Sequence, residues 1–130
     1  MSEAEPCIAA SPDANVDCSH KESGKFLVEV NSLFTHRNMH LKQAMKACNF
    51  CEKDEAGEYQ AKATHGYYHQ IQCQRAVTGI HRSYLYIYTK KAIQTILVKF
   101  GAMFWGDVCL RLWEVWKQHM FPKLVEKVRN

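Results

Sequence analysis

The sequence has no long hydrophobic run, no internal repeat and no low-complexity segment. No apolar stretch approaches the roughly 20 residues that a membrane-spanning helix needs, so the sequence predicts no membrane partner. Residues 1–5 include two glutamates, whereas a secretory signal peptide begins with basic residues. We therefore expect an intracellular protein, in the nucleus or the cytoplasm.

The chain also carries little net charge, and its cysteines do not indicate a disulfide framework. A formal net charge of +4 permits binding to DNA without predicting it. Six cysteines in a chain without a secretory signal are typical of reduced thiols. With 130 residues, of which 47% are hydrophobic, the chain can bury one core. We expect a single domain over residues 1–130.

Local patterns predict both strands and helices. Residues 84–88 and 95–98 are rich in aromatic and β-branched side chains, which favours two strands paired as a hairpin. Residues 38–47 and 67–78 have the apolar spacing of helices, and Gly79 fits the position that follows the second helix. The charged stretch 52–58 predicts a solvated loop.

A further helix is predicted from residue 104 onward by an apolar stripe at helical spacing. Such a stripe normally packs on a sheet, so we expect its aromatic side chains to lie in the core. Pro122 is expected to kink or end this helix. The stripe consists of Phe104, Trp105, Val108, Cys109, Leu112, Val115 and Trp116.

Two acidic residues are candidates for a metal site. Asp13 follows a proline in a predicted turn, and Glu29 lies within an apolar, β-branched run that predicts a strand. Mg²⁺ prefers hard oxygen ligands, and two neighbouring carboxylates repel each other unless a cation lies between them. The same residues also fit an acid on an edge strand and an acid that shapes a turn.

Three stretches in a fixed order carry a resemblance to a known family. They are 11–13 (Ser-Pro-Asp), 29–31 (Glu-Val-Asn) and 67–74 (Tyr-Tyr-His-Gln-Ile-Gln-Cys-Gln), and 76–79 (Ala-Val-Thr-Gly) follows them. The chain resembles the YqaJ viral recombinase domain, a relative of lambda exonuclease among the restriction-endonuclease-like nucleases. The resemblance extends from about Cys7 to the end of the chain.

The resemblance implies an α/β protein with the restriction-endonuclease-like (PD-(D/E)xK) fold, in which helices flank a central mixed sheet. The family has an upstream helix that this chain does not contain, so we expect a domain that is incomplete at the N-terminus. The implied activity is metal-dependent exonuclease cleavage of linear duplex DNA with Mg²⁺ or Mn²⁺. Relatives form rings, so a homo-oligomer is a further implied partner.

The resemblance also implies roles for individual residues. Asp13 and Glu29 would be metal ligands, with the carbonyl of Val30 contributing, and Gln70 would position the attacking water. The family has a lysine two residues after the glutamate, where this chain has Asn31. Asparagine can hydrogen-bond but brings no charge to the developing transition state.

The alternatives concern both activity and ligand. By the resemblance Arg37, Gln72 and Gln74 would contact DNA, although Arg37 is equally well explained as a solvated loop cation. The loss of the lysine and of the upstream helix favours a non-catalytic DNA-binding domain or a decayed nuclease. A competing interpretation is a zinc-bound interaction module, with the pattern Cys48-x2-Cys51 and His69-x3-Cys73 as ligands.

Overall fold

The computed structural model describes residues 8–19 and 24–129, so Cys7, where the family resemblance is expected to begin, lies outside the described residues. The chain divides into two units, residues 1–100 and residues 101–130, where the sequence predicts one domain. The first unit is a mixed α/β structure with a mixed sheet and helices, and the second is helical.

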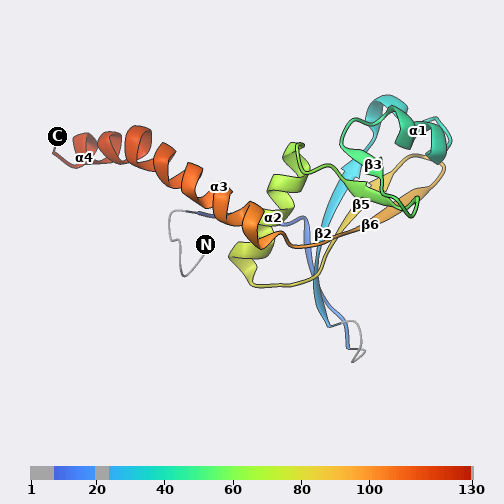
Figure 1. Cartoon of the computed structure of the whole chain (residues 1–130), viewed down its shortest axis with the longest axis horizontal. Coiled ribbons are helices and arrows are strands. Elements are labelled where there is room, and N and C mark those ends of the chain that lie inside the picture. The colour runs from blue at the N-terminus through green and yellow to red at the C-terminus, as the bar shows by residue number, and fades with distance from the viewer. Residues whose placement is uncertain (1–7, 20–23, 130) are drawn as a thin grey trace. The chain divides into compact units, whose positions relative to one another are not determined.

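The main sheet has four strands in the order β1-β2-β5-β6 (Figure 1). Their bounds are β1 Ala14–Asp17, β2 Lys25–Ser32, β5 Ser83–Tyr88 and β6 Ile93–Val98. β1 pairs with β2 and β5 pairs with β6 in antiparallel fashion, whereas β2 and β5 are parallel, with Glu29 opposite Leu85. The predicted hairpin of β5 and β6 is confirmed.

The long connection between β2 and β5 supplies the remaining elements of the first unit. It contains a 3₁₀ turn, η1 Phe34–His36, then α1 Leu41–Ala47, a hairpin of β3 Cys51–Lys53 and β4 Tyr59–Ala61, and α2 Gly66–Thr78. A crossover of this kind is required because parallel strands cannot be joined by a tight turn.

The core of the first unit lies on one face of the sheet. Strand alternation turns Leu85 and Ile87 of β5 and Ile96 and Val98 of β6 to the same side. Ile71 of α2 is fully buried against them. The elements before α2 complete this core with Leu33, Ala44, Met45, Cys48, Phe50 and Cys51.

The opposite face of the sheet is also apolar but more exposed. Val30, Tyr88 and Ile93 expose 46%, 42% and 64% of their surface. Together with Phe26, Val28 and Tyr86 they line one shallow hollow on this face. The alternation in β2 therefore separates Glu29, on the core face, from Val28 and Val30 on the other.

Two helices of the first unit agree with the sequence patterns. α2 spans Gly66–Thr78 and ends at Gly79, whose φ of 68° is left-handed and whose N–H donates to the Arg75 carbonyl. This is the predicted end of the helix. α1 lies within the predicted range 38–47 but begins only at Leu41.

Three short strands, β1, β3 and β4, were not predicted. The charged stretch 52–58 is only partly a loop, because Glu52 and Lys53 belong to β3 and pair with β4. A three-residue strand is too short to show an apolar pattern, and Glu52 and Lys53 of β3 are both exposed. β1 is likewise a short strand of mainly exposed residues.

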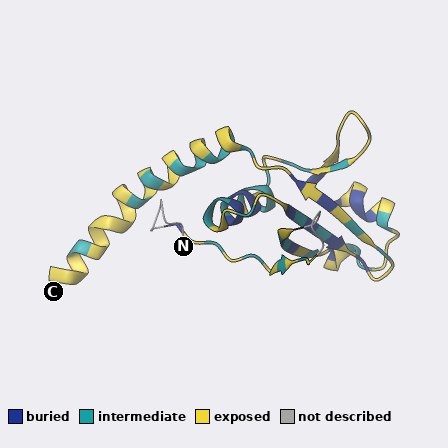
Figure 2. Cartoon of the chain, turned by 90° about the horizontal axis from the view of Figure 1, so that it is seen from below, coloured by how far each residue is buried: buried dark blue, intermediate teal, exposed yellow. Residues whose placement is uncertain are grey.

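The second unit consists of helical segments only. They are α3 Ala102–Val115, a π-helical turn η2 Trp116–Met120, and α4 Phe121–Arg129. No residue of these three segments is buried, and Figure 2 shows them in the colours of intermediate and exposed residues. Within this unit the aromatic stripe forms no buried core, and its packing on a sheet stays a prediction, because an apolar helical face does not identify what packs on it.

Pro122 does not end the helix. The wider π-helical turn lies directly before it, and the Phe121 N–H donates to the carbonyl of Trp116, five residues earlier. In a regular α-helix the proline ring would meet the carbonyl four residues before it, so a change of helical type here accommodates the proline.

No helix in the part of the chain that the structure describes is long and apolar enough to cross a membrane.

Candidate functional site

Glu29 is the central residue of the candidate site. It lies in the middle of β2 and exposes only 7% of its surface. Two glutamines one turn apart on α2 donate to it: the Gln74 Nε2 to the Glu29 Oε2 at 2.8 Å, and the Gln70 Nε2 to the Glu29 Oε1. Residues four apart share a helical face, so the glutamine spacing of α2 positions both amides over one carboxylate.

Asp13 joins the site through the backbone. Its Oδ2 accepts a hydrogen bond from the N–H of Val30 at 2.8 Å, which places its carboxylate beside the residue that follows Glu29. Gln74 also donates to the carbonyl of Ser11 at 3.1 Å. The three stretches that carry the family resemblance therefore meet in space, although they are separated by up to 63 positions in the sequence.

The electrostatics of the site are those of two close acids. Burial raises the pKa of Glu29 above its ordinary value, and the negative charge of Asp13 raises it further, while the hydrogen bonds from Gln74 and Gln70 act in the opposite direction. A cation between two neighbouring carboxylates stabilises their charged forms. A cation between Asp13 and Glu29 would therefore cancel the part of the pKa increase of Glu29 that the charge of Asp13 causes.

Asn31 lies on the same face of β2 as Glu29, because residues two apart in a strand point to the same side. Its Nδ2 atom is buried and has no hydrogen-bond partner. A buried donor without an acceptor is unfavourable, so the amide of Asn31 is a neutral donor whose hydrogen-bonding capacity is not used.

Gln72 and Gln74 do not fit the prediction that they contact DNA. Both are completely buried, and the Gln72 Nε2 donates to the carbonyl of Lys99 at 2.8 Å. Gln72 thus connects α2 to the end of β6, and Gln74 connects α2 to Glu29 and Ser11. Spacing within a helix predicts which residues share a face, but it does not predict how deeply that face is buried.

Sequence reasoning missed Arg75 as a structural residue. It is 6% exposed and donates to two backbone carbonyls, those of Val98 at 2.5 Å and His81. Burial lowers its pKa from the ordinary value. The only signal available was a basic residue in the last turn of α2, where it normally faces the solvent.

Arg37 is engaged locally. Its NH1 group donates to the carbonyl of Phe34 at 2.9 Å, and its guanidinium carbon lies 4.2 Å from the centre of the Phe34 ring. A contact with DNA stays a prediction for this residue. The role of the Val30 carbonyl as a metal ligand also stays a prediction, since the contact seen for Val30 is made by its N–H.

The zinc module is not supported. Among residues 8–19 and 24–129 there is no group of three or more His, Cys, Asp or Glu side chains that could hold a metal ion. Cys48 and Cys51 lie beside α1, whereas His69 and Cys73 lie on α2. The sequence spacing resembles a zinc motif, but the fold does not bring the two halves together.

Comparison of the chain with protein-family models, with curated proteins and with solved structures finds no match. The functional argument therefore depends on the geometry around Glu29. Asp13, Glu29, Gln70 and Gln74 are brought together, and Asn31 lies on the same strand face. Gln72 connects α2 to the end of β6, and Arg37 contacts Phe34.

Proposed function

We propose that this chain is a nuclease-type domain of the restriction-endonuclease-like class that binds linear duplex DNA and has an impaired capacity to hydrolyse its phosphodiesters. The observation that supports this most is the convergence on Glu29: Asp13 lies beside Val30, and Gln70 and Gln74 hold the carboxylate. Metal-dependent nuclease centres place two acids on neighbouring backbone segments in this way.

The residues present fit a divalent cation with hard ligands. Mg²⁺ is usually held by one or two carboxylates and keeps several waters, and Asp13 with Glu29 is such a pair. Burial is the main cause of the raised pKa of Glu29, and the negative charge of Asp13 adds to it. When bound, Mg²⁺ or Mn²⁺ would polarise a phosphoryl oxygen and lower the pKa of a bound water.

The protein's own residues would hold and orient the reactants. Gln70 is exposed and anchored to Glu29, so its amide oxygen remains available to accept a hydrogen bond from a water molecule. Asn31 can donate a hydrogen bond but supplies no positive charge. Loss of one group that stabilises transition-state charge typically lowers the rate by about 10²–10³-fold, which is the basis for expecting impaired hydrolysis.

A non-catalytic DNA-binding domain is the second candidate. Two observations favour it: Asn31 is uncharged, and both carboxylate oxygens of Glu29 already accept hydrogen bonds from glutamine amides. In this case the centre would be a structural remnant, and the protein would bind DNA without cutting it.

The first experiment compares the wild-type protein with Asn31→Lys on 5′-phosphorylated linear duplex DNA in Mg²⁺ or Mn²⁺, with nucleotide release as the readout. We expect release by the wild type to be slow or absent and release by Asn31→Lys to be higher by about 10²-fold. Circular dichroism of the variant checks that the new lysine does not unfold the sheet.

The double variant Asn31→Lys with Glu29→Gln is the matched control and should lose the gained activity. Fluorescence anisotropy with labelled duplex DNA measures binding separately from cutting. Binding without release in both proteins would favour the second candidate, and the absence of both binding and release would contradict the proposed function.

A further inference from the structure

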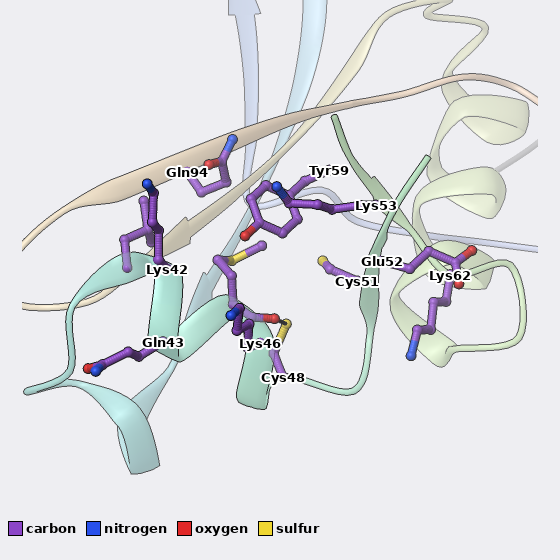
Figure 3. A pocket seen from close by; sticks show the side chains of 12 residues that line it. Lys42, Gln43, Lys46, Cys48, Cys51, Glu52, Lys53, Tyr59, Lys62 and Gln94 are labelled. Atoms are coloured by element: carbon purple, nitrogen blue, oxygen red, sulfur yellow. Dashed lines mark hydrogen bonds between the residues drawn. The ribbon is translucent and has the colours of Figure 1, made fainter. Parts of the chain in front are cut away.

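A second cluster of candidate ligands lies in the first unit, away from the residues of the Glu29 centre. It borders a cavity of about 690 Å³ between α1 and the β3–β4 hairpin. Three sulfur-containing side chains line this cavity: Met45 of α1, Cys48 at the end of α1, and Cys51 at the start of β3. Figure 3 shows the side chains of Cys48 and Cys51 at the cavity wall.

The two thiols are neighbours in a protected environment. Cys48 and Cys51 expose 9% and 5% of their surface, and neither forms a disulfide. Burial raises the pKa of Cys51 well above its ordinary value, and the adjacent Cys48 raises it further by charge and by hydrogen bonding. The Cys48 thiol also donates to the Met45 carbonyl at 3.1 Å. The local backbone therefore holds the two sulfurs side by side.

The donor set excludes a complete zinc site and favours a softer ion. Structural zinc requires four ligands from Cys, His or acidic residues, and no group of three or more such side chains that could hold a metal ion is found among the described residues. Thiolate and thioether ligands select Cu(I), and this ion needs only two or three sulfur ligands. Met45 lines the same cavity and carries a thioether.

The charged side chains around the cavity are also compatible with a Cu(I) complex. Four lysines line it, and the one acid among the lining residues is Glu52. A Cu(I) ion bound by two thiolates has a net charge of −1, which nearby lysines stabilise by Coulomb attraction. The lysines are Lys42, Lys46, Lys53 and Lys62.

We propose that Cys48 and Cys51, assisted by Met45, form a binding site for one Cu(I) ion. Binding replaces the two thiol protons with the metal: one Cu(I) and two thiols give one bis-thiolate complex and two released protons, with no change in oxidation state. This site is independent of the proposed nuclease function, because it shares no residue with the Glu29 centre.

Anaerobic titration of the reduced full-length protein with Cu(I), in competition with the chromophoric chelator bicinchoninate, tests the proposal. We expect one equivalent of Cu(I) to transfer from the chelator to the protein. Cys48→Ser and Cys51→Ser should each abolish this transfer, and Met45→Leu should weaken it by roughly tenfold, as loss of a supporting ligand commonly does.

Cys18→Ser is the matched control, since Cys18 lies outside the cavity in the β1–β2 connection, and it should bind Cu(I) like the wild type. Circular dichroism shows whether each variant folds. Transfer that persists in the double variant Cys48→Ser with Cys51→Ser, or no transfer to the reduced wild type, would overturn the proposal.

Discussion

At the scale of single residues, the structure is organised around a buried carboxylate. An ionised side chain inside a protein is unfavourable unless hydrogen bonds or opposite charges compensate it. Glu29 receives two amide donors, and one of them, Gln74, is itself fully buried. The amide of Gln74 therefore has a structural role as a donor to the buried carboxylate, and this role does not depend on any chemistry at the centre.

The first prediction concerns Gln74→Leu. Leucine has a similar volume but cannot donate to Glu29 or to the Ser11 carbonyl, so both acceptors lose a partner. We expect the free energy of unfolding to fall by about 1–3 kcal/mol, the usual cost of an unsatisfied buried group. Urea denaturation measures it. The control, Gln43→Leu on the exposed side of α1, should change stability by no more than about 0.5 kcal/mol.

The second prediction concerns the pH dependence of Glu29. Its pKa in the folded state lies above the ordinary value of 4.5, so the folded protein binds more protons than the unfolded chain between these two pKa values. The contribution of Glu29 to stability therefore falls as pH rises through this window, starting near 4.5. Above the folded-state pKa the unfavourable contribution is complete.

Denaturation of wild type and Glu29→Gln across this pH range isolates the effect. The unfolding free energy of the wild type, minus that of the variant, should decrease as pH rises and then level off. Added Mg²⁺ should reduce this decrease if the cation binds the two acids. Parallel curves for the two proteins would show that Glu29 does not have a raised pKa.

At the scale of elements, α2 carries most of the arrangement. It supplies Gln70 and Gln74 to Glu29, Gln72 to the end of β6, and Arg75 to two backbone carbonyls. These five hydrogen bonds, from four side chains, fix the position of the helix along the sheet and its rotation about its own axis. The end of α2 therefore matters for the geometry of the site.

The third prediction compares Gly66, the first residue of α2, with Gly79, the residue that follows the helix. Gly79 follows the helix with a φ of 68°, so Gly79→Ala should destabilise the protein by about 1 kcal/mol, because a side chain disfavours left-handed backbone. Gly66 is the first helical residue, has no positive φ, and has open space around the position of a Cβ atom. Gly66→Ala should be neutral or stabilising. Thermal unfolding of both variants checks this contrast.

The elements also show what the sequence could predict. α2, β5 and β6 were predictable because their patterns are long and regular and because Gly79 marks a helix end. β1, β3 and β4 are too short and too exposed to show an alternating pattern. Their positions depend on pairing with β2 and with each other, which is information that a local window of sequence does not contain.

The sequence predicted which residues form the candidate site better than it predicted what each of them does. Motif order brought Asp13, Glu29 and Gln70 together, and the structure places them together. The burial of Gln72 and Gln74 was not predictable, because helical spacing gives the same pattern for an exposed row of glutamines. Depth of burial depends on β6 and on the segment before β1, which are distant in the sequence.

At the scale of the whole molecule, the chain separates into a unit with a core and a unit without buried residues. Every buried side chain in the described part of the chain lies between Ile8 and Val98. The second unit keeps an apolar stripe with aromatic contacts between Trp113 and Trp116 and between Trp116 and Phe121. Helical stability in proteins usually comes from packing of such a face.

The last prediction follows from this division. A fragment that ends at Phe100 keeps the complete buried core, together with the hydrogen bonds that α2 makes to the carbonyls of Val98 and Lys99. We therefore expect the fragment to unfold cooperatively in urea, because cooperativity depends on a shared core. A peptide of residues 101–130 should be only partly helical in water, since isolated helices without packing are marginal. Circular dichroism of the two pieces tests both expectations. Loss of cooperative unfolding in the fragment would contradict this expectation and would show that the first unit needs residues 101–130 for its stability.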